Sequence, residues 1–184
     1  MKQIVFSLIL FIYGLFSKAQ TIAVNTDLLL LTFQTYNIGA EMTISNKSTL
    51  GLNIFTTKDP YWSKGTKFVG LNPELRYYFS GRPMYHHFIG LTGSIIDYDI
   101  KWKLSRYRGL SVGGGVSIGW VGAITKRFTL DLHLGVGLNI YHHRKTIDNF
   151  LEYETPSGIV TDNGYLGYNL FPLKVGVTMS YIIR

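Results

Sequence analysis

The residues best placed to do chemistry together begin with Glu74 and Arg76, two positions apart in the sequence. Side chains two positions apart on a β-strand lie on the same face, so this pair predicts a carboxylate–guanidinium contact. Equivalent faces of other predicted strands carry further ionisable residues, and together the seven form the lumen charge network: Asp27, Glu41, Glu74, Arg76, Asp131, His133 and Lys174. Such a set can be an acid/base pair, a path for protons or ions, or a salt-bridged plug. We favour the plug, because buried charges need partners and paired carboxylates alone do not indicate catalysis.

Two pairs of adjacent histidines, His86-His87 and His142-His143, resemble metal ligands when the sequence is read linearly. Adjacent residues on a strand face opposite ways, and the predicted topology puts the two pairs at opposite ends of the molecule. We therefore predict no metal site and no cofactor.

A lipid-modifying enzyme is an alternative, because Ser105 or Ser157 with His142 and Asp148 would supply a nucleophile, a base and an acid near one rim. Nothing in their spacing fixes a common geometry. We therefore predict no catalytic residues.

The elements that must hold the lumen charge network are β-strands with one apolar and one polar face. In residues 129–140, the clearest case, Leu130, Leu132, Leu134, Val136, Leu138 and Ile140 alternate with polar residues and glycine. A strand that crosses a membrane needs about 9–11 residues of this kind. The pattern predicts an all-β fold: an eight-stranded antiparallel up-and-down transmembrane β-barrel of the outer-membrane type.

We place the eight strands at residues 21–31, 37–45, 48–57, 67–79, 87–98, 110–124, 129–140 and 171–183. The first is the weakest, because the leucine run at 28–31 hides the alternation. In the last, the expected apolar face is Leu173, Val175, Val177, Met179 and Tyr181. Short connections alternate with mostly longer ones, as in barrels that have short periplasmic turns and long outer loops.

A soluble lipocalin-like barrel is the alternative fold, because its strands also alternate, with the apolar residues inside. The apolar faces of this chain hold no charged residue, as lipid contact requires, since Arg or Lys at the bilayer midplane costs about 2–4 kcal/mol. The polar faces are mostly small, which suits a narrow barrel interior. Two aromatic girdles are expected at the strand ends: Tyr77, Phe79, Trp120, Phe128 and Tyr181 at one, and Tyr61, Trp62, Tyr98, Trp102 and Tyr141 at the other.

The N-terminus carries the features of an export signal. Met1-Lys2 precedes an apolar run at residues 4–16, and Ser17-Lys18-Ala19 offers small residues before a cut after Ala19. We expect residues 1–19 to be a signal peptide and residues 20–184 to be a single outer-membrane β-barrel domain. Loss of Lys2 and Lys18 would lower the formal net charge from +7 to +5. The chain has no cysteine, which excludes a disulfide framework.

The segment Asn72-Pro73-Glu74-Leu75-Arg76-Tyr77-Tyr78-Phe79 resembles the "PELRYWF" segment of a family of small outer-membrane β-barrels, mainly from Bacteroidetes, catalogued as a domain of unknown function. Residues 24–29 are similar to its "KTNLL" opening, residues 38–41 to its "NLGVE" segment, and residues 175–183 to its closing strand. The resemblance implies the fold and an outer-membrane location. It implies no catalytic residues.

Basic residues concentrate at Lys101, Lys103, Arg106 and Arg108, in a predicted outer loop. We expect such a cluster to contact either the phosphates of lipopolysaccharide or a polysaccharide. The alternative is an ordinary solvated loop. Expected partners are outer-membrane lipid and lipopolysaccharide, with surface proteins or polysaccharide on the outer loops. Nucleic acid is not expected. The expected function is a structural, adhesive or surface-binding role with a plugged lumen, and a lipid-modifying enzyme or a narrow pore are the alternatives.

Overall fold

The protein is an antiparallel β-sheet closed into a ring. The computed structural model describes residues 21–61, 63–102, 105–147, 159–160 and 165–183; the predicted signal at 1–19 lies outside them. The strands are β1 (Ile22–Asp27), β2 (Thr35–Ser45), β3 (Ser48–Lys58), β4 (Thr66–Tyr78), β5 (His86–Trp102), β6 (Ser105–Ala123), β7 (Phe128–Ile147), β8 (Ile159–Val160) and β9 (Tyr165–Ile183).

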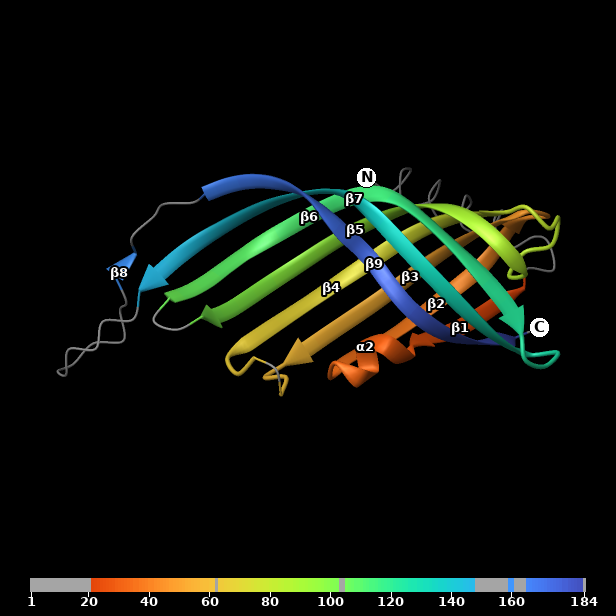
Figure 1. Ribbon diagram of the computed structural model, residues 1–184, viewed down its shortest axis with the longest axis horizontal. Coiled ribbons are helices and arrows are strands. Elements are labelled where there is room, and N and C mark those ends of the chain that lie inside the picture. The colour runs from red at the N-terminus through yellow and green to blue at the C-terminus, as the bar shows by residue number, and fades with distance from the viewer. Residues whose placement is uncertain (1–20, 62, 103–104, 148–158, 161–164, 184) are drawn as a thin grey trace, which may run out of the picture.

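Eight of these strands form the ring, and every neighbouring pair is antiparallel. Strands β1 to β7 pair in sequence order, β7 pairs with β9, and β9 pairs with β1. The two-residue β8 only extends the end of β7. The predicted eight-stranded antiparallel fold is therefore confirmed (Figure 1).

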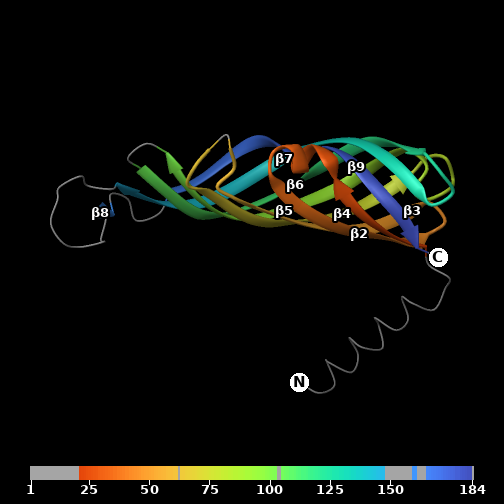
Figure 2. The same ribbon diagram turned by 90° about the horizontal axis from the view of Figure 1, so that it is seen from below.

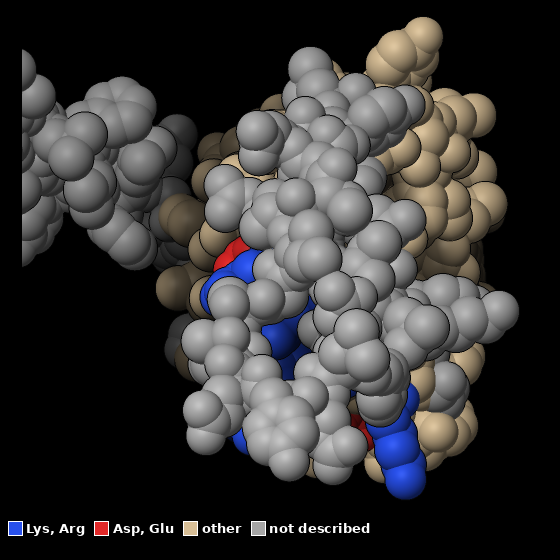
Figure 3. Space-filling model, turned by 90° about the vertical axis from the view of Figure 1, so that its left-hand side faces the viewer, with Lys and Arg blue, Asp and Glu red and all other residues tan. Residues whose placement is uncertain are grey.

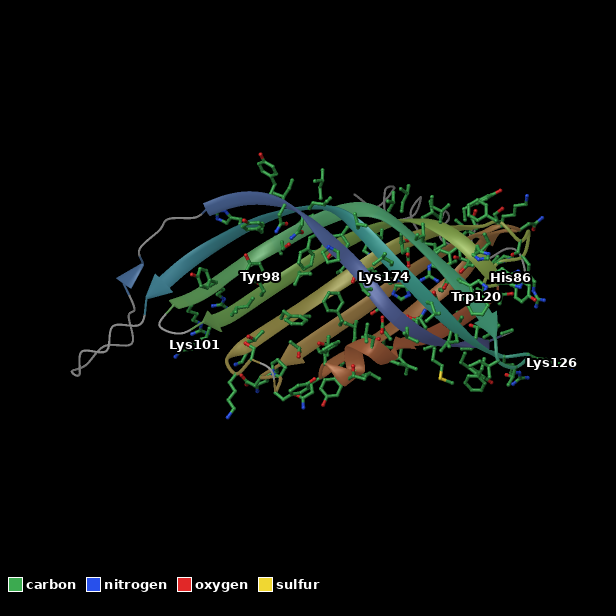
Figure 4. The ribbon with its side chains drawn as sticks, viewed as in Figure 1. His86, Tyr98, Lys101, Trp120, Lys126 and Lys174 are labelled. Atoms are coloured by element: carbon green, nitrogen blue, oxygen red, sulfur yellow. The ribbon has the colours of Figure 1, made fainter. Side chains whose placement is uncertain are left out.

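The two ends of the ring differ. At the end that we call the turn end, residues 46–47, 79–85 and 124–127 connect strands, and β9 finishes there (Figure 2). The opposite, loop end carries the connections after β1, β3, β5 and β7. Figure 4 places Tyr98 and Lys101 toward the loop end, Lys174 near the middle, and Trp120 and Lys126 at the turn end.

The first strand is shorter than predicted. It stops at Asp27, and the leucine run forms a helix, α2 (Leu28–Thr32). The Asp27 carboxylate accepts hydrogen bonds from the backbone N–H groups of Leu29 (2.9 Å) and Leu30 (3.2 Å). An aspartate in this N-cap position satisfies donors that a helix start leaves unpaired, so Asp27 ends the strand and begins the helix.

Strands β5, β6, β7 and β9 extend further toward the loop end than predicted, and project beyond the other strands in Figure 1. Trp102 pairs with Ser105, so the connection between β5 and β6 has two residues. In β9 the prediction began at residue 171 and missed the outward Tyr168 and Leu170, which pair with Ile140 and Leu138. In β5 it stopped just beyond the last outward apolar residues, Leu91 and Ile95. The backbone ladder continues beyond them with outward polar residues such as Asp97, Asp99 and Lys101.

A β-bulge changes the phase of β9. Lys174 pairs with Gly135 and Pro172 with Val136, which leaves Leu173 as the extra residue. Leu173 lies over Gly113 and Gly137, where a Cβ on either glycine would collide with it. Leu173 therefore faces the interior and not the outer apolar face as predicted, because a bulge shifts the alternation by one residue.

The outer face of the ring is apolar over its central part, which we call the apolar belt. On β7, Leu132, Leu134, Val136, Leu138 and Ile140 are 43–62% exposed. Buried residues of the interior are mostly polar. No helix of the described residues is long and apolar enough to cross a membrane.

The aromatic residues expected at the turn end do lie on the outer surface there: Tyr77, Phe79, Trp120, Phe128 and Tyr181 are all exposed. At the loop end Tyr61 is exposed, but Tyr98 and Tyr141 line an interior cavity. Trp62 and the Trp102 side chain lie outside the described residues. The girdle prediction thus fails for Tyr98 and Tyr141, since both stand on the inward face of their strands.

Candidate functional site

Arg76 is the centre of the buried charge cluster in the ring. It comes from β4, and its guanidinium contacts carboxylates from three strands: Nη1 lies 2.7 Å from Asp131 Oδ2 and 3.2 Å from Glu41 Oε2, and Nε lies 2.9 Å from Glu74 Oε2. The other side of the guanidinium lies over the ring of Phe88, 4.3 Å from its centroid. All four charged side chains are at most 6% exposed. One cation thus holds three strands together.

Glu74 has a second cationic partner and a hydroxyl donor. Lys174 Nζ lies 2.6 Å from Glu74 Oε2, and Ser117 Oγ donates to Glu74 Oε1 at 2.5 Å. Charged hydrogen bonds of this kind are the stronger class. Glu74 therefore connects β4 with β6 and β9.

His133 lies between Asp131 and the one remaining carboxylate, Asp27. Its Nδ1 lies 3.4 Å from Asp131 Oδ1 and its Nε2 lies 3.6 Å from Asp27 Oδ2. Both distances are too long for good hydrogen bonds, and neither ring nitrogen has a hydrogen-bond partner among the described residues. Gly176 passes so close to Asp27 and His133 that a Cβ there would overlap the Asp27 carboxylate.

The structure thus brings all seven residues of the lumen charge network together. A small cavity lined by four of them, Glu41, Glu74, Arg76 and Lys174, measures about 10 Å³, about the space that one water needs. Sequence reasoning missed three hydroxyl donors: Ser117, which donates to Glu74, and Thr49 Oγ1 and Tyr78 OH, which both donate to Glu41 Oε1, at 2.5 and 2.8 Å. Their positions on the polar faces were visible in the alternation, but their partners on other strands were not.

The Tyr78 hydroxyl provides a specific test of this geometry. Tyr78→Phe would remove one hydrogen-bond donor from the buried Glu41 carboxylate. We expect a loss of about 1–3 kcal/mol in the free energy of unfolding. Tyr77→Phe is the matched control, because Tyr77 is 43% exposed on the outer face. The measurement is urea unfolding of protein refolded in lipid vesicles. Equal effects of the two changes would contradict the proposed role of the Glu41 contact.

The other predicted sites do not gather in this way. His86 pairs with Val121 of β6, whereas His142 pairs with Leu110 of the same strand, so the two histidine pairs lie about ten strand positions apart, roughly 35 Å. Ser157 and Asp148 lie outside the described residues, as does the Ser105 side chain, so the alternative catalytic set has no observed geometry.

The basic cluster is partly described. Arg106 and Arg108 on β6 and Lys101 on β5 are exposed, and Lys103 lies outside the described residues. Arg106 makes a two-pronged contact with Asp99, with Nε–Oδ1 at 2.7 Å and Nη2–Oδ2 at 2.6 Å. Figure 3 views the loop end and shows basic side chains there, with fewer acidic ones.

The loop-end half of the interior holds a cavity of about 750 Å³ that the sequence reasoning missed. Its wall is mainly apolar and comes from several strands: Phe55, Phe68, Ile96, Ile100, Tyr107 and Leu173. The signal was present in pairs such as Phe68-Val69 and Ile95-Ile96, where both faces of a strand are apolar. The interior therefore has a charged half near the turn end and an apolar half near the loop end.

Comparison with known proteins identifies a family and nothing more specific. No curated protein and no solved structure matches the chain. The resemblance to an uncharacterised family, predicted from residues 72–79, is confirmed. Because the match to the family described as "Protein of unknown function (DUF3575)" covers residues 5–183, the protein belongs to that family.

Proposed function

We propose that the protein is an integral outer-membrane barrel that is closed to ions and has a structural or surface-binding role. The observation that carries this proposal is the exposed apolar belt around a ring that holds the lumen charge network in its interior. An exposed apolar surface of this extent is not expected of a protein surrounded by water. Contact with lipid accounts for the exposure of the belt, and the ring pairs most of the strand edges whose backbone groups lipid would leave unsatisfied.

The lumen charge network supports a plug in preference to a pore. Arg76 and Lys174 contact carboxylates from opposite sides of the interior, and the space between them is about 10 Å³. A continuous water path needs more room than one molecule. The network therefore connects strands on opposite sides of the barrel and fills the space between them.

Anionic lipid headgroups are the partner that the outer surface favours. Lys67, Lys101, Arg106 and Arg108, which we call the basic band, are exposed on neighbouring strands β4, β5 and β6. The band lies on the loop-end side of the apolar belt, where the headgroups of an outer leaflet would begin. Phosphates pair well with several Arg and Lys together.

Cysteine labelling tests the membrane location and the orientation. The chain has no cysteine, so any label on a variant reports the introduced residue. Lys64 and Lys126 are both exposed, in the connections at the loop end and the turn end respectively. Lys64→Cys should react with a membrane-impermeant maleimide on intact cells, whereas Lys126→Cys should react only after the outer membrane is broken. The wild-type protein is the unlabelled control. Labelling of Lys126→Cys alone on intact cells would invert the orientation, and labelling of neither variant would argue against surface exposure.

A further inference from the structure

We infer that the loop-end cavity binds one acyl chain of a membrane lipid, which enters sideways from the bilayer between β9 and α2. This inference rests on the proposed membrane location. It assigns a ligand class to a cavity that the structural or surface-binding role does not use.

The cavity has the size and the lining of a site for an apolar ligand. At about 750 Å³ it lies within the range of small-molecule sites, about 300–1,000 Å³, and eight-stranded barrels are wide enough to hold one small ligand. Most of the wall area is aromatic and aliphatic, although polar side chains such as Asn139, Asn169 and Asp27 also reach it. Water in the cavity would form few hydrogen bonds with this wall. A hydrocarbon chain would displace that water and remove the apolar wall from contact with it.

The polar floor of the cavity limits how deep a chain can go. Asn53, Asn72 and Lys174 line both this cavity and the small one inside the lumen charge network. The Asn53 amide oxygen is buried without a hydrogen-bond partner among the described residues. A hydrocarbon chain that reached this layer would have to displace polar contacts, so its end should stop above it.

The cavity reaches the outer surface around one edge of β9. By register, Lys174 faces inward with Gly135, while Pro172 and Val175 face outward with Val136 and Leu134. All three residues line the cavity, as does Leu30 of α2. Residues from both faces of one strand can line one cavity only where the cavity wraps around that strand's edge.

Among the described residues, no strand pairs with that edge of β9 over much of its length. β1 pairs with β9 only from Thr178 to Ile183, because β1 ends at Asp27. Above this point the described residues place α2 next to β9 and β2, and we call the boundary between β9 and α2 the seam. Leu28 and Leu31 of α2 are exposed. Pro172, which has no N–H to donate, is a residue type typical of strand edges.

The seam lies at the height of the apolar belt. Val177 pairs with Leu132 and Tyr168 pairs with Ile140, so the open edge of β9 spans the same height as the belt residues of β7. Unpaired backbone that faces hydrocarbon is costly. Pro172 has no N–H to leave unpaired at this edge, and α2 contacts β9 beside it. At this height the opening faces the hydrocarbon region, and the ligand in reach is an acyl chain.

Photolabelling tests this inference directly. The full-length protein is refolded into phosphatidylcholine vesicles that contain a phosphatidylcholine with a diazirine at the end of one acyl chain. After illumination, peptide mapping should find adducts on interior residues such as Phe68, Tyr107 and Leu173, in addition to the apolar belt. A parallel sample receives the free fatty acid that carries the same diazirine.

Adjacent residues of β5 supply a matched pair of variants. Ile96→Trp would fill the cavity, because Ile96 lines it, and should lower interior labelling roughly tenfold, the change that 1.4 kcal/mol of binding free energy produces. Ile95→Trp adds the same bulk on the outer face, where Ile95 is 41% exposed, and should leave interior labelling unchanged.

Heat-modifiable gel mobility, measured on the same vesicles, separates the possible outcomes. A protein that does not insert would overturn the proposed function and this inference with it. An inserted wild-type protein with adducts on outward residues alone would overturn the inference and leave the proposed function standing. Interior adducts from the free fatty acid, but none from the phosphatidylcholine, would overturn sideways entry. The wild-type map decides these points even if Ile96→Trp does not refold.

Discussion

Among single changes in the barrel interior, Arg76→Gln is expected to lower the free energy of unfolding the most. The guanidinium contacts Glu41, Glu74 and Asp131 at 2.7–3.2 Å, and its loss would leave buried carboxylates without their main partner. Removing one member of a buried ion pair typically costs about 3–5 kcal/mol. The measurement is urea unfolding in lipid vesicles, with planar-bilayer conductance recorded on the same protein.

Two comparisons make this result specific. Arg82→Gln changes an exposed arginine in the connection at the turn end and should alter the free energy of unfolding by less than about 0.5 kcal/mol. The double change Glu74→Gln with Arg76→Gln should cost less than the sum of the two single changes, because the pair is coupled. Additive single effects, together with a large steady conductance of the wild-type protein, would exclude the plug and favour a pore.

Leu134→Arg should weaken folding into lipid by about 2–4 kcal/mol, the cost of a cation near the bilayer midplane. Leu134 lies in the middle of the apolar belt and is 48% exposed, so the arginine would enter lipid without disturbing interior packing. The readout is the free energy of unfolding from vesicles.

Ile124→Arg is the control for depth. Ile124 is exposed, as Leu134 is, at 59% against 48%. It lies at the turn end, just after β6, where the cost of a charge falls to about 0–1 kcal/mol. Wild-type stability of Leu134→Arg in vesicles would show that the apolar belt does not lie in lipid.

The fold could be predicted from the sequence wherever one face of a strand is apolar and the other small or polar. Residues 37–45, 48–57 and 129–140 meet this condition, and each lies in a strand of the ring. The prediction failed where a single residue has two roles. Asp27 belongs to the lumen charge network and also caps α2, and the alternation cannot reveal a helix cap. The bulge at Leu173 was also not predicted, because the apolar run Leu170-Phe171-Pro172 before it hides the shift in alternation.

The candidate site could be predicted as a set of residues but not as a geometry. Two-residue periodicity put Glu74, Arg76 and Tyr78 on one face, yet which strands face each other across the interior depends on the closure of the ring. The loop-end cavity was missed for a different reason. Its wall contains Phe55, Phe68 and Ile96, and apolar residues on the inward face do not stand out beside apolar residues on the outward face, such as Ile54, Val69 and Ile95.

The short pairing of β1 with β9 has a consequence for how the barrel forms. All other ring contacts join strands that are neighbours in sequence or nearly so, but this one joins the two ends of the described chain, Ile22 with Ile183. Contacts of such high sequence separation pay the greatest loop-closure entropy and form late. The six residues of β1 form few backbone hydrogen bonds with β9 to offset that entropy. We therefore expect folding to proceed through an open sheet with exposed strand edges, and the rate of the final step to depend on how quickly residues 22–27 find their partners.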